Sequence, residues 1–309
     1  MLALLFPGQA SQAVGMGADL QQASAAATRL FQLADEITGL PITRLCGEGP
    51  LDQLTDTAVA QPAVVTTSLA ALAVLRENVA LEFGAVAGHS VGEFAAYAAA
   101  DVFDAETALK LVHVRAQAMA SACACVEGSM AAVIGLDEVA LRRACSEATT
   151  DGSSVELANL NAPGQLIVSG ARDALQRLSL AARAAGARRV LPLNVGGPFH
   201  SIYMRDAAQP LADALHALEL RPANVPVALN VSAELATDPL PLRDELEVQV
   251  YSPVRWIEDL ERLALLGCDR FVEVGPGNVL TGLVKRTLPA ATAVSFGSPD
   301  DLPAVRALL

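Results

Sequence analysis

The chain has 309 residues, of which 52% are hydrophobic and 18% are charged, and its formal net charge at pH 7 is −13. This length and apolar content are enough for one large globular domain with an insertion, or for two domains of ordinary size. The acidic balance argues against a nucleic-acid-binding protein, because neutralising phosphates over a broad surface requires clustered Lys and Arg.

Short apolar runs alternate with helix-like segments in the first part of the chain. Residues 2–6 have the pattern of a buried strand that leads into a Pro7-Gly8-Gln9 loop, and helices follow from about Met16. A second strand at 84–88 precedes a helix at 93–100, and another helix covers 105–122. Alternating strands and helices predict a parallel sheet with helices on both faces.

The pattern changes between residues 127 and 195. The expected elements are strand 130–134, helix 138–148, strand 154–157, a turn at 161–164, strand 166–169, helix 171–185 and strand 189–193. This βαββαβ order is typical of ferredoxin-like units. We therefore predict an α/β protein in which a ferredoxin-like α+β subdomain, 127–195, is inserted into a large α/β-hydrolase-like domain made of 1–126 and 196–309.

The large domain resumes with a Gly196-Gly197-Pro198 loop. The elements expected after it are helix 201–218, strand 225–230, a helical region around 256–266 and strand 270–274. A Gly275-Pro276-Gly277 turn then opens a last helix.

The Gly88-His89-Ser90-Val91-Gly92 motif lies between a strand and a helix. A sharp strand-to-helix turn of this kind exposes the serine hydroxyl at the strand tip, in strained backbone geometry, with the next amide pointing toward the group under attack. We therefore predict that Ser90 is the nucleophile of an acyl-transfer reaction, although the motif does not identify the acyl group.

A serine hydroxyl needs a base within hydrogen-bond reach, and the chain has four histidines. His89 belongs to the turn itself, and His113 and His216 lie within expected helices. His200 follows the glycine-rich loop and precedes a helix, whose dipole disfavours a charged imidazole. His200 is therefore the expected general base.

Arg115 stands in the middle of the apolar stripe of helix 105–122, so its side chain should point inward. A buried guanidinium must be paired, and no acidic residue lies within four positions of it on the helix. Two interpretations stay open: a structural ion pair with a distant carboxylate, or a bidentate clamp on a substrate carboxylate.

Stabilising an oxyanion usually takes two backbone amides. Val91, directly after the nucleophile, should supply one of them. The other is expected from the loop after the first strand, where Gly8 permits a close approach.

A series of motifs spread over nearly the whole chain resembles, in residues and in order, the malonyl-CoA:acyl carrier protein transacylases. The motifs are Phe6-Pro7-Gly8-Gln9, Gly88-His89-Ser90-Val91-Gly92-Glu93, Arg115 with Met119 one turn later, Asn159-x-Asn161-x-Pro163-Gly164-Gln165, His200, Gln249-Val250-Tyr251-Ser252-Pro253-Val254-Arg255-Trp256 and Glu273-Val274-Gly275-Pro276-Gly277.

The resemblance implies a two-step reaction with malonyl-CoA and acyl carrier protein as partners. Ser90 would take the malonyl group as an ester and pass it to the phosphopantetheine thiol, with His200 as the base. The backbone carbonyl of Gln249 would orient His200 in place of an acid. The implied substrate-binding set is Arg115 for the malonyl carboxylate, the Gln9 and Val91 amides, Met119, Gln249, Phe199 and Asn159.

Two positions bear on how closely the family pattern is followed. Ala10 stands where the family commonly has a glycine, which could shift the Gln9 amide. Phe199, directly before His200, resembles malonyl-selective relatives, in which bulk excludes a branched methyl group.

Two other function classes remain as alternatives. A serine hydrolase would use Ser90, an acid such as Asp173, and His200 in that chain order. A non-catalytic subunit for docking a carrier protein would keep the fold without the nucleophile's activity. Within the transacylases, fatty-acid synthesis is expected, with a polyketide acyltransferase or a malonate decarboxylase subunit as alternatives.

Composition and charge give the remaining expectations. The five scattered cysteines do not indicate disulfides, and the Cys123–Cys125 pair has too few neighbouring ligands for a metal site. No signal peptide and no run of about 18 uncharged apolar residues is found, so we expect a cytoplasmic monomer with no membrane contact, no metal and no cofactor besides the coenzyme A thioester. An acidic carrier needs a local basic patch, and the candidates are Arg183, Arg188 and Arg189, or Lys285 and Arg286.

Overall fold

The computed structural model describes residues 1–309. Its helices and strands follow one another in this order: β1 (Leu2–Phe6), α1 (Ala18–Ala23), α2 (Ala25–Thr38), α3 (Ile42–Glu48), α4 (Leu51–Thr55), α5 (Thr57–Asn78), β2 (Ala85–Gly88), α6 (Gly92–Ala99), α7 (Ala105–Cys123), β3 (Gly128–Ile134), α8 (Glu138–Ala148), β4 (Val155–Ala162), β5 (Gln165–Ala171), α9 (Arg172–Ala184), β6 (Arg189–Pro192), η1 (Ile202–Met204), α10 (Arg205–His216), β7 (Val227–Ala228), β8 (Leu235–Ala236), α11 (Pro239–Val248), η2 (Gln249–Tyr251), α12 (Trp256–Leu265), β9 (Arg270–Val274), α13 (Val279–Thr287), β10 (Thr292–Phe296), η3 (Pro299–Asp301) and α14 (Leu302–Leu308).

A six-stranded sheet forms the centre of the large unit, with the strand order β10-β9-β1-β2-β7-β8. Every neighbouring pair from β10 to β7 is parallel, and only β8 runs antiparallel, so the predicted parallel sheet is confirmed. In the central pair, Phe6 lies opposite Gly88. The loops that leave β1 and β2 therefore begin side by side at the carboxyl edge of the sheet.

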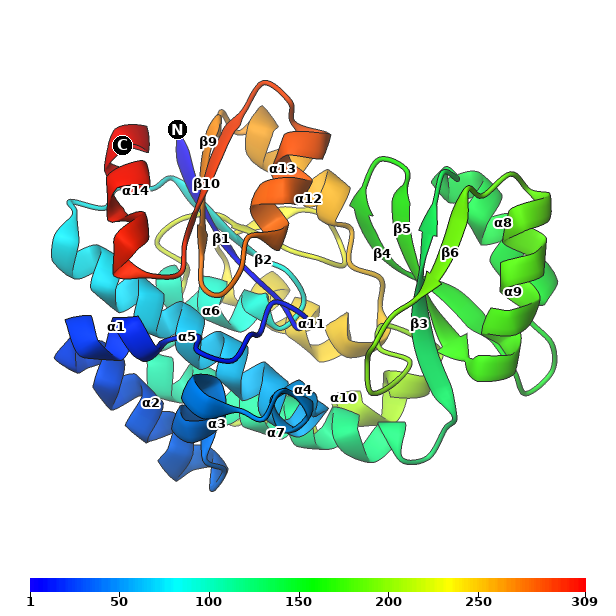
Figure 1. The fold of residues 1–309 in the computed structure, drawn as a ribbon, viewed down its shortest axis with the longest axis horizontal. Helices are drawn as coiled ribbons and strands as arrows, with labels where there is room; N and C mark the ends of the chain where they lie inside the picture. The colour runs from blue at the N-terminus through cyan, green and yellow to red at the C-terminus, as the bar shows by residue number, and fades with distance from the viewer.

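Side chains of β1 alternate between two hydrophobic clusters, as expected for a strand covered on both faces. Leu2, Leu4 and Phe6 pack into the cluster shared with the helices from α1 to α7, whereas Ala3 and Leu5 pack against α12 and α13. Figure 1 shows these two helical layers on opposite sides of the central strands. The large unit is thus a three-layer α/β sandwich.

One helix requires a correction to the expected absence of long apolar segments. Helix α5 is long and apolar enough to cross a membrane by length and composition alone. However, 89% of its apolar window is buried inside the protein, as in the core helix of a globular domain. The sequence does not show this helix as a continuous apolar segment because Thr, Ser and Gln residues interrupt its apolar residues.

The predicted βαββαβ unit is present as β3, α8, β4, β5, α9 and β6, and its antiparallel sheet has the order β4-β5-β3-β6. This is the ferredoxin-like arrangement. In Figure 1, α8 and α9 cover the face of this sheet that points away from the large unit. The opposite face contributes residues such as Met130 and Ile167 to the main hydrophobic cluster.

The two units are joined by main-chain hydrogen bonds as well as by the connecting segments. The Leu160 N–H donates to the carbonyl of Val254, and the Val254 N–H donates to the carbonyl of Ala158, each over 2.8 Å. Strand β4 thus pairs for a short stretch with the segment that precedes α12. This backbone pairing fixes the small sheet beside the large one.

Several elements differ from the sequence expectations. Strand β4 extends to Ala162, so Asn159 and Asn161 lie on the strand and the turn expected at 161–164 is shortened to 163–164, and the expected helix 201–218 is divided into η1 and α10. Strand β7 is only two residues long, and β8, α11, β10 and α14 were not expected. Helix α11 was missed because prolines occupy its first turn, a position that a helix tolerates but that resembles a loop in sequence.

Candidate active site

Ser90 occupies the sharp turn between β2 and α6 with a φ of 53°, in the left-handed region that non-glycine residues seldom adopt. Close packing explains the flanking glycines. A Cβ on Gly92 would come within 2.2 Å of the Phe6 carbonyl oxygen, and a Cβ on Gly88 within 2.1 Å of the Glu93 backbone nitrogen. The turn therefore has the strained geometry that the Gly-x-Ser-x-Gly motif predicts.

His200 lies next to Ser90, with its Nε2 atom 2.8 Å from Ser90 Oγ. The Nδ1 atom lies 3.0 Å from the backbone carbonyl oxygens of both Gln249 and Ser252. Because both neighbours of Nδ1 are acceptors, that nitrogen carries the proton and Nε2 is left to accept one. The imidazole is thus held in the tautomer that a general base requires.

Burial lowers the pKa of His200 to about 3, with the positive charge of Arg115 and the nearby His89 as further causes. A neutral imidazole was expected from the dipole of the helix that follows. In the structure, burial of the ring is the largest cause of the low pKa and the charge of Arg115 the second.

Arg115 points inward from α7 and is 1% exposed. Its Nη2 atom donates to Ser90 Oγ over 3.0 Å and to Gln249 Oε1 over 2.8 Å, and its Nη1 atom donates to Gln61 Oε1. None of these partners is a carboxylate, so the interpretation as a structural ion pair with a distant acid is wrong. Burial lowers the pKa of Arg115 to about 9, which leaves the guanidinium charged at neutral pH.

The two backbone amides expected to bind an oxyanion, those of Gln9 and Val91, donate to no group of the protein. They leave the adjacent tips of β1 and β2. Ala10, the residue that replaces the family's glycine, has a φ of 80°. The loop therefore keeps the glycine-like conformation at this position despite the extra methyl group.

A cavity of about 240 Å³ opens beside Ser90 and His200. Its walls come from both units, with Met119 and Phe199 from the large one and Asn159 and Ile167 from the small one. Helix α13 adds three apolar residues, Val279, Leu280 and Leu283. The site is a mostly apolar cleft between the two sheets with one buried cation at its base.

The structure adds four polar residues that the sequence analysis did not assign to the site. Gln61 binds Arg115, Ser252 shares the contact to His200, Asn161 Oδ1 lies 2.8 Å from His89 Nε2, and Asn230 Oδ1 accepts from the Ser90 N–H over 2.7 Å. Two of them carried a signal. Gln61 is a lone amide in the apolar part of α5, and Asn230 ends an expected strand at the sheet edge where ligands bind.

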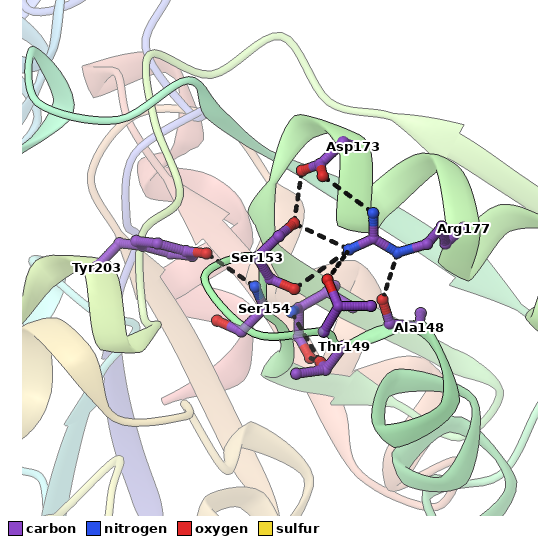
Figure 2. A network of polar contacts seen from close by, with 9 residues as sticks. Ala148, Thr149, Ser153, Ser154, Asp173, Arg177 and Tyr203 are labelled. Atoms are coloured by element: carbon purple, nitrogen blue, oxygen red, sulfur yellow. Dashed lines mark hydrogen bonds and ion pairs between the residues drawn. The ribbon is translucent and has the colours of Figure 1, made fainter.

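Asp173 does not take part in this site. Figure 2 shows its carboxylate in the small subdomain, where it accepts from Ser153 Oγ over 2.6 Å and from Arg177 over 2.9 Å. The same network reaches the large unit through Ser154, whose N–H donates to the hydroxyl of Tyr203 over 2.8 Å. The proposed Ser90–His200–Asp173 triad of a hydrolase is therefore wrong, because backbone carbonyls occupy the place of the acid.

Comparisons with known proteins agree with this geometry. A family model described as the acyl transferase domain matches residues 3–299. The malonyl CoA-acyl carrier protein transacylases of Bacillus subtilis strain 168 and Escherichia coli K12 are 41% and 38% identical, over 97% and 98% of this chain and 95% and 97% of their own sequences.

Two solved structures have the same fold over nearly the whole chain. The acyl carrier protein S-malonyltransferase of Vibrio cholerae is 40% identical with a TM-score of 0.93, and the match covers 98% of this chain and 99% of that one. A malonyl-transacylase in complex with its type II PKS acyl-carrier protein is 37% identical, also with a TM-score of 0.93, over 99% and 98%. With Ser90, His200 and Arg115 gathered at one cleft and family matches along its length, this chain belongs to the malonyl-CoA:acyl carrier protein transacylases of the acyl transferase family.

Proposed function

We propose that this protein transfers a malonyl group from malonyl-CoA to the phosphopantetheine thiol of an acyl carrier protein through a malonyl ester of Ser90. The observation that carries this proposal is the buried guanidinium of Arg115, which donates to Ser90 Oγ over 3.0 Å and otherwise to the amide oxygens of Gln61 and Gln249, and to no carboxylate. An acyl group that ends in a carboxylate would supply the missing charge. The names of the matching relatives support the same reaction.

In the first half-reaction, Ser90 Oγ attacks the thioester carbonyl while His200 Nε2 accepts the hydroxyl proton. The oxyanion of the tetrahedral intermediate receives hydrogen bonds from the Gln9 and Val91 amides. The C–S bond then breaks, and His200 returns the proton to the departing coenzyme A thiolate. Ser90 is left as the malonyl ester.

In the second half-reaction, the carrier's phosphopantetheine thiol takes the place of coenzyme A. His200 accepts the thiol proton, and the sulfur attacks the ester carbonyl, with the same amides binding the oxyanion. The C–O bond to Ser90 breaks and His200 protonates the serine oxygen. One serine thus serves both halves, which makes the mechanism ping-pong.

The malonyl carboxylate would bind Arg115 at the base of the cleft. The Nε atom of Arg115 is buried and has no hydrogen-bond partner, so a donor is available in addition to the two engaged nitrogens. Met119 and Phe199 form apolar walls beside the acyl group, and Asn159 adds an amide from the small sheet. These walls exclude water, which would otherwise hydrolyse the ester.

We infer that the carrier protein serves fatty-acid synthesis, with a polyketide carrier as the second candidate. The second candidate is favoured by the similarity to a malonyl-transacylase solved with its type II PKS carrier. Lys285 and Arg286 make no salt bridge within the chain, and Arg286 donates to Gln165, which lines the cleft. This basic pair at the mouth is the proposed contact for the acidic carrier, with Arg188 and Arg189 as the alternative patch.

Mass spectrometry after mixing the protein with malonyl-CoA tests the reaction. We expect one malonyl adduct on the wild type, loss of the adduct in Ser90→Ala, and transfer of the group to added holo-carrier. No adduct on the wild type would support the non-catalytic docking subunit, and rapid release of free malonate without transfer would support a hydrolase. Comparing kcat/KM for fatty-acid and polyketide carriers decides between the two pathways.

A further inference from the structure

The strained turn at Ser90 is held from behind by side chains that do not line the cleft. A φ of 53° at a residue with a side chain persists only where its surroundings fix it. Both peptide groups of Ser90 are bound by residues far away in the sequence. The Ser90 N–H donates to Asn230 Oδ1 over 2.7 Å, and the Ser90 carbonyl accepts from Gln249 Nε2 over 2.9 Å.

The carboxamide of Asn230 can bind in only one orientation. Its Nδ2 atom donates to the Gly88 carbonyl over 2.8 Å and to Asp259 Oδ2 over 3.0 Å, while its oxygen faces the Ser90 N–H. Asn230 is fully buried and is absent from the cavity wall. It thus binds the chain on both sides of His89 without reaching the substrate, which requires an acceptor and two donors on one short side chain.

Glu93 connects this residue to Gln249. One carboxylate oxygen of Glu93 accepts from the Asn230 backbone N–H over 2.9 Å, and the other accepts from Gln249 Nε2. Gln249 in turn accepts from Arg115 through Oε1 over 2.8 Å. The backbone of the nucleophile, the buried cation and the two amide side chains therefore form one hydrogen-bonded network.

The contact with the Ser90 carbonyl also sets the direction of the Val91 N–H. These two groups belong to one planar trans peptide and point in opposite directions. Gln249, which does not line the cavity, holds the carbonyl, and the Val91 N–H on the other side of this peptide donates to no group of the protein. Fixing this peptide therefore aligns the nucleophile and one oxyanion donor together.

We propose that Asn230 and Glu93 are positioning residues that hold the Ser90 turn in its reactive geometry, Asn230 directly and Glu93 through Asn230 and Gln249. The consequence for the malonyl transfer rests on the proposed function, whereas the effect on Ser90 reactivity does not. Because Asn230 does not line the cleft and does not contact Arg115, its loss should slow bond formation and leave the affinity for malonyl-CoA unchanged, whereas Glu93 also holds Gln249, a partner of Arg115.

The test compares Asn230→Leu, which has a similar size and no hydrogen-bonding groups, with the wild type. Two rates are measured: malonylation of Ser90 over a range of malonyl-CoA concentrations, and labelling of Ser90 by an uncharged fluorophosphonate. We expect both limiting rates to fall by about 10²-fold, the effect of a displacement of about 1 Å, with the half-saturating malonyl-CoA concentration changed by less than about threefold. Leu75→Ala, in the core at the far end of α5, is the control that lowers the melting temperature and leaves both rates per folded molecule unchanged.

Glu93→Gln is the second variant, because it keeps the size and shape of the side chain and so tests the proposal even if Asn230→Leu fails to fold. The NH2 group of the new amide would face one of the two N–H donors that Glu93 now accepts from, so one hydrogen bond is lost. Both the malonylation rate and the labelling rate should therefore fall by about tenfold. The proposal would be overturned if either folded variant reacted at the wild-type rates, or if only the half-saturating malonyl-CoA concentration changed. If the wild type reacts with the fluorophosphonate and not with malonyl-CoA, the proposed function fails, while slower labelling of Asn230→Leu still supports the positioning role.

Discussion

Replacing Arg115 with methionine should have opposite effects on stability and on activity. Burial lowers the pKa of Arg115 from 12.5 to about 9. At ~1.4 kcal/mol for each pKa unit, holding this charge inside the folded protein costs roughly 5 kcal/mol. The variant also leaves Gln61, Gln249 and Ser90 without the Arg115 donor, and each lost hydrogen bond reduces this gain in stability by roughly 1 kcal/mol. The net change is a gain of roughly 2 kcal/mol, or a melting temperature higher by about 3 °C for a chain of this length.

The same substitution should lower kcat/KM for malonyl-CoA by about 10²–10³-fold, because a buried charge-assisted contact to the substrate carboxylate is lost. Thermal unfolding and the rate of Ser90 malonylation are measured on the same preparations. Arg76→Met is the control, since that exposed arginine donates to the Ala99 carbonyl away from the cleft. A melting temperature lowered by several degrees would show that Arg115 is a structural cation, and an unchanged kcat/KM would show that the carboxylate binds elsewhere.

Three further predictions concern the base, the first loop and the support of the cation. Because burial lowers the pKa of His200 to about 3, the malonylation rate should not decrease as the pH falls through 6.5, and a decrease there would contradict the buried neutral base. Between pH 6.5 and 3 the imidazole is protonated in the unfolded chain and neutral in the folded one. The wild type should therefore lose stability relative to His200→Gln as the pH falls through this range, as measured by chemical denaturation. Ala10→Gly should relieve the φ of 80° and raise the melting temperature by about 1 °C, measured by calorimetry, and a decrease would mean that the methyl group is accommodated without strain. Gln61→Leu removes the acceptor from Arg115 and should lower kcat/KM for malonyl-CoA by about tenfold in steady-state assays, whereas an unchanged value would show that Gln249 alone fixes the guanidinium.

The sequence predicted the parts of the site that depend on local chain geometry. Ser90 was recognisable because a Gly-x-Ser-x-Gly turn between a strand and a helix has few other uses, and Arg115 because a charge in an apolar helical stripe must point inward. The ferredoxin-like order was visible in the alternation of elements. Each of these signals lies within a short stretch of chain.

What the sequence did not predict depends on contacts between distant residues. Asn230 lies 140 positions from Ser90 along the chain, and nothing in its neighbourhood shows that its oxygen meets that amide. The low pKa of His200 comes mainly from burial, which appears only once both units enclose the cleft. Asp173 has the chain position of a triad acid, but its helix lies in the small subdomain (Figure 2).

The backbone pairing of β4 with Val254 has a consequence for how water is excluded from the malonyl ester. The two hydrogen bonds between Val254 and strand β4 oppose a hinge-like separation of the two units. We therefore expect the pantetheine arm to enter and leave the cleft without such a movement. The malonyl ester of Ser90 is then protected from water by the fit of the bound pantetheine arm against the apolar walls of the cleft. Substitutions that widen the cleft should therefore increase hydrolysis of the ester before they change which acyl group is accepted.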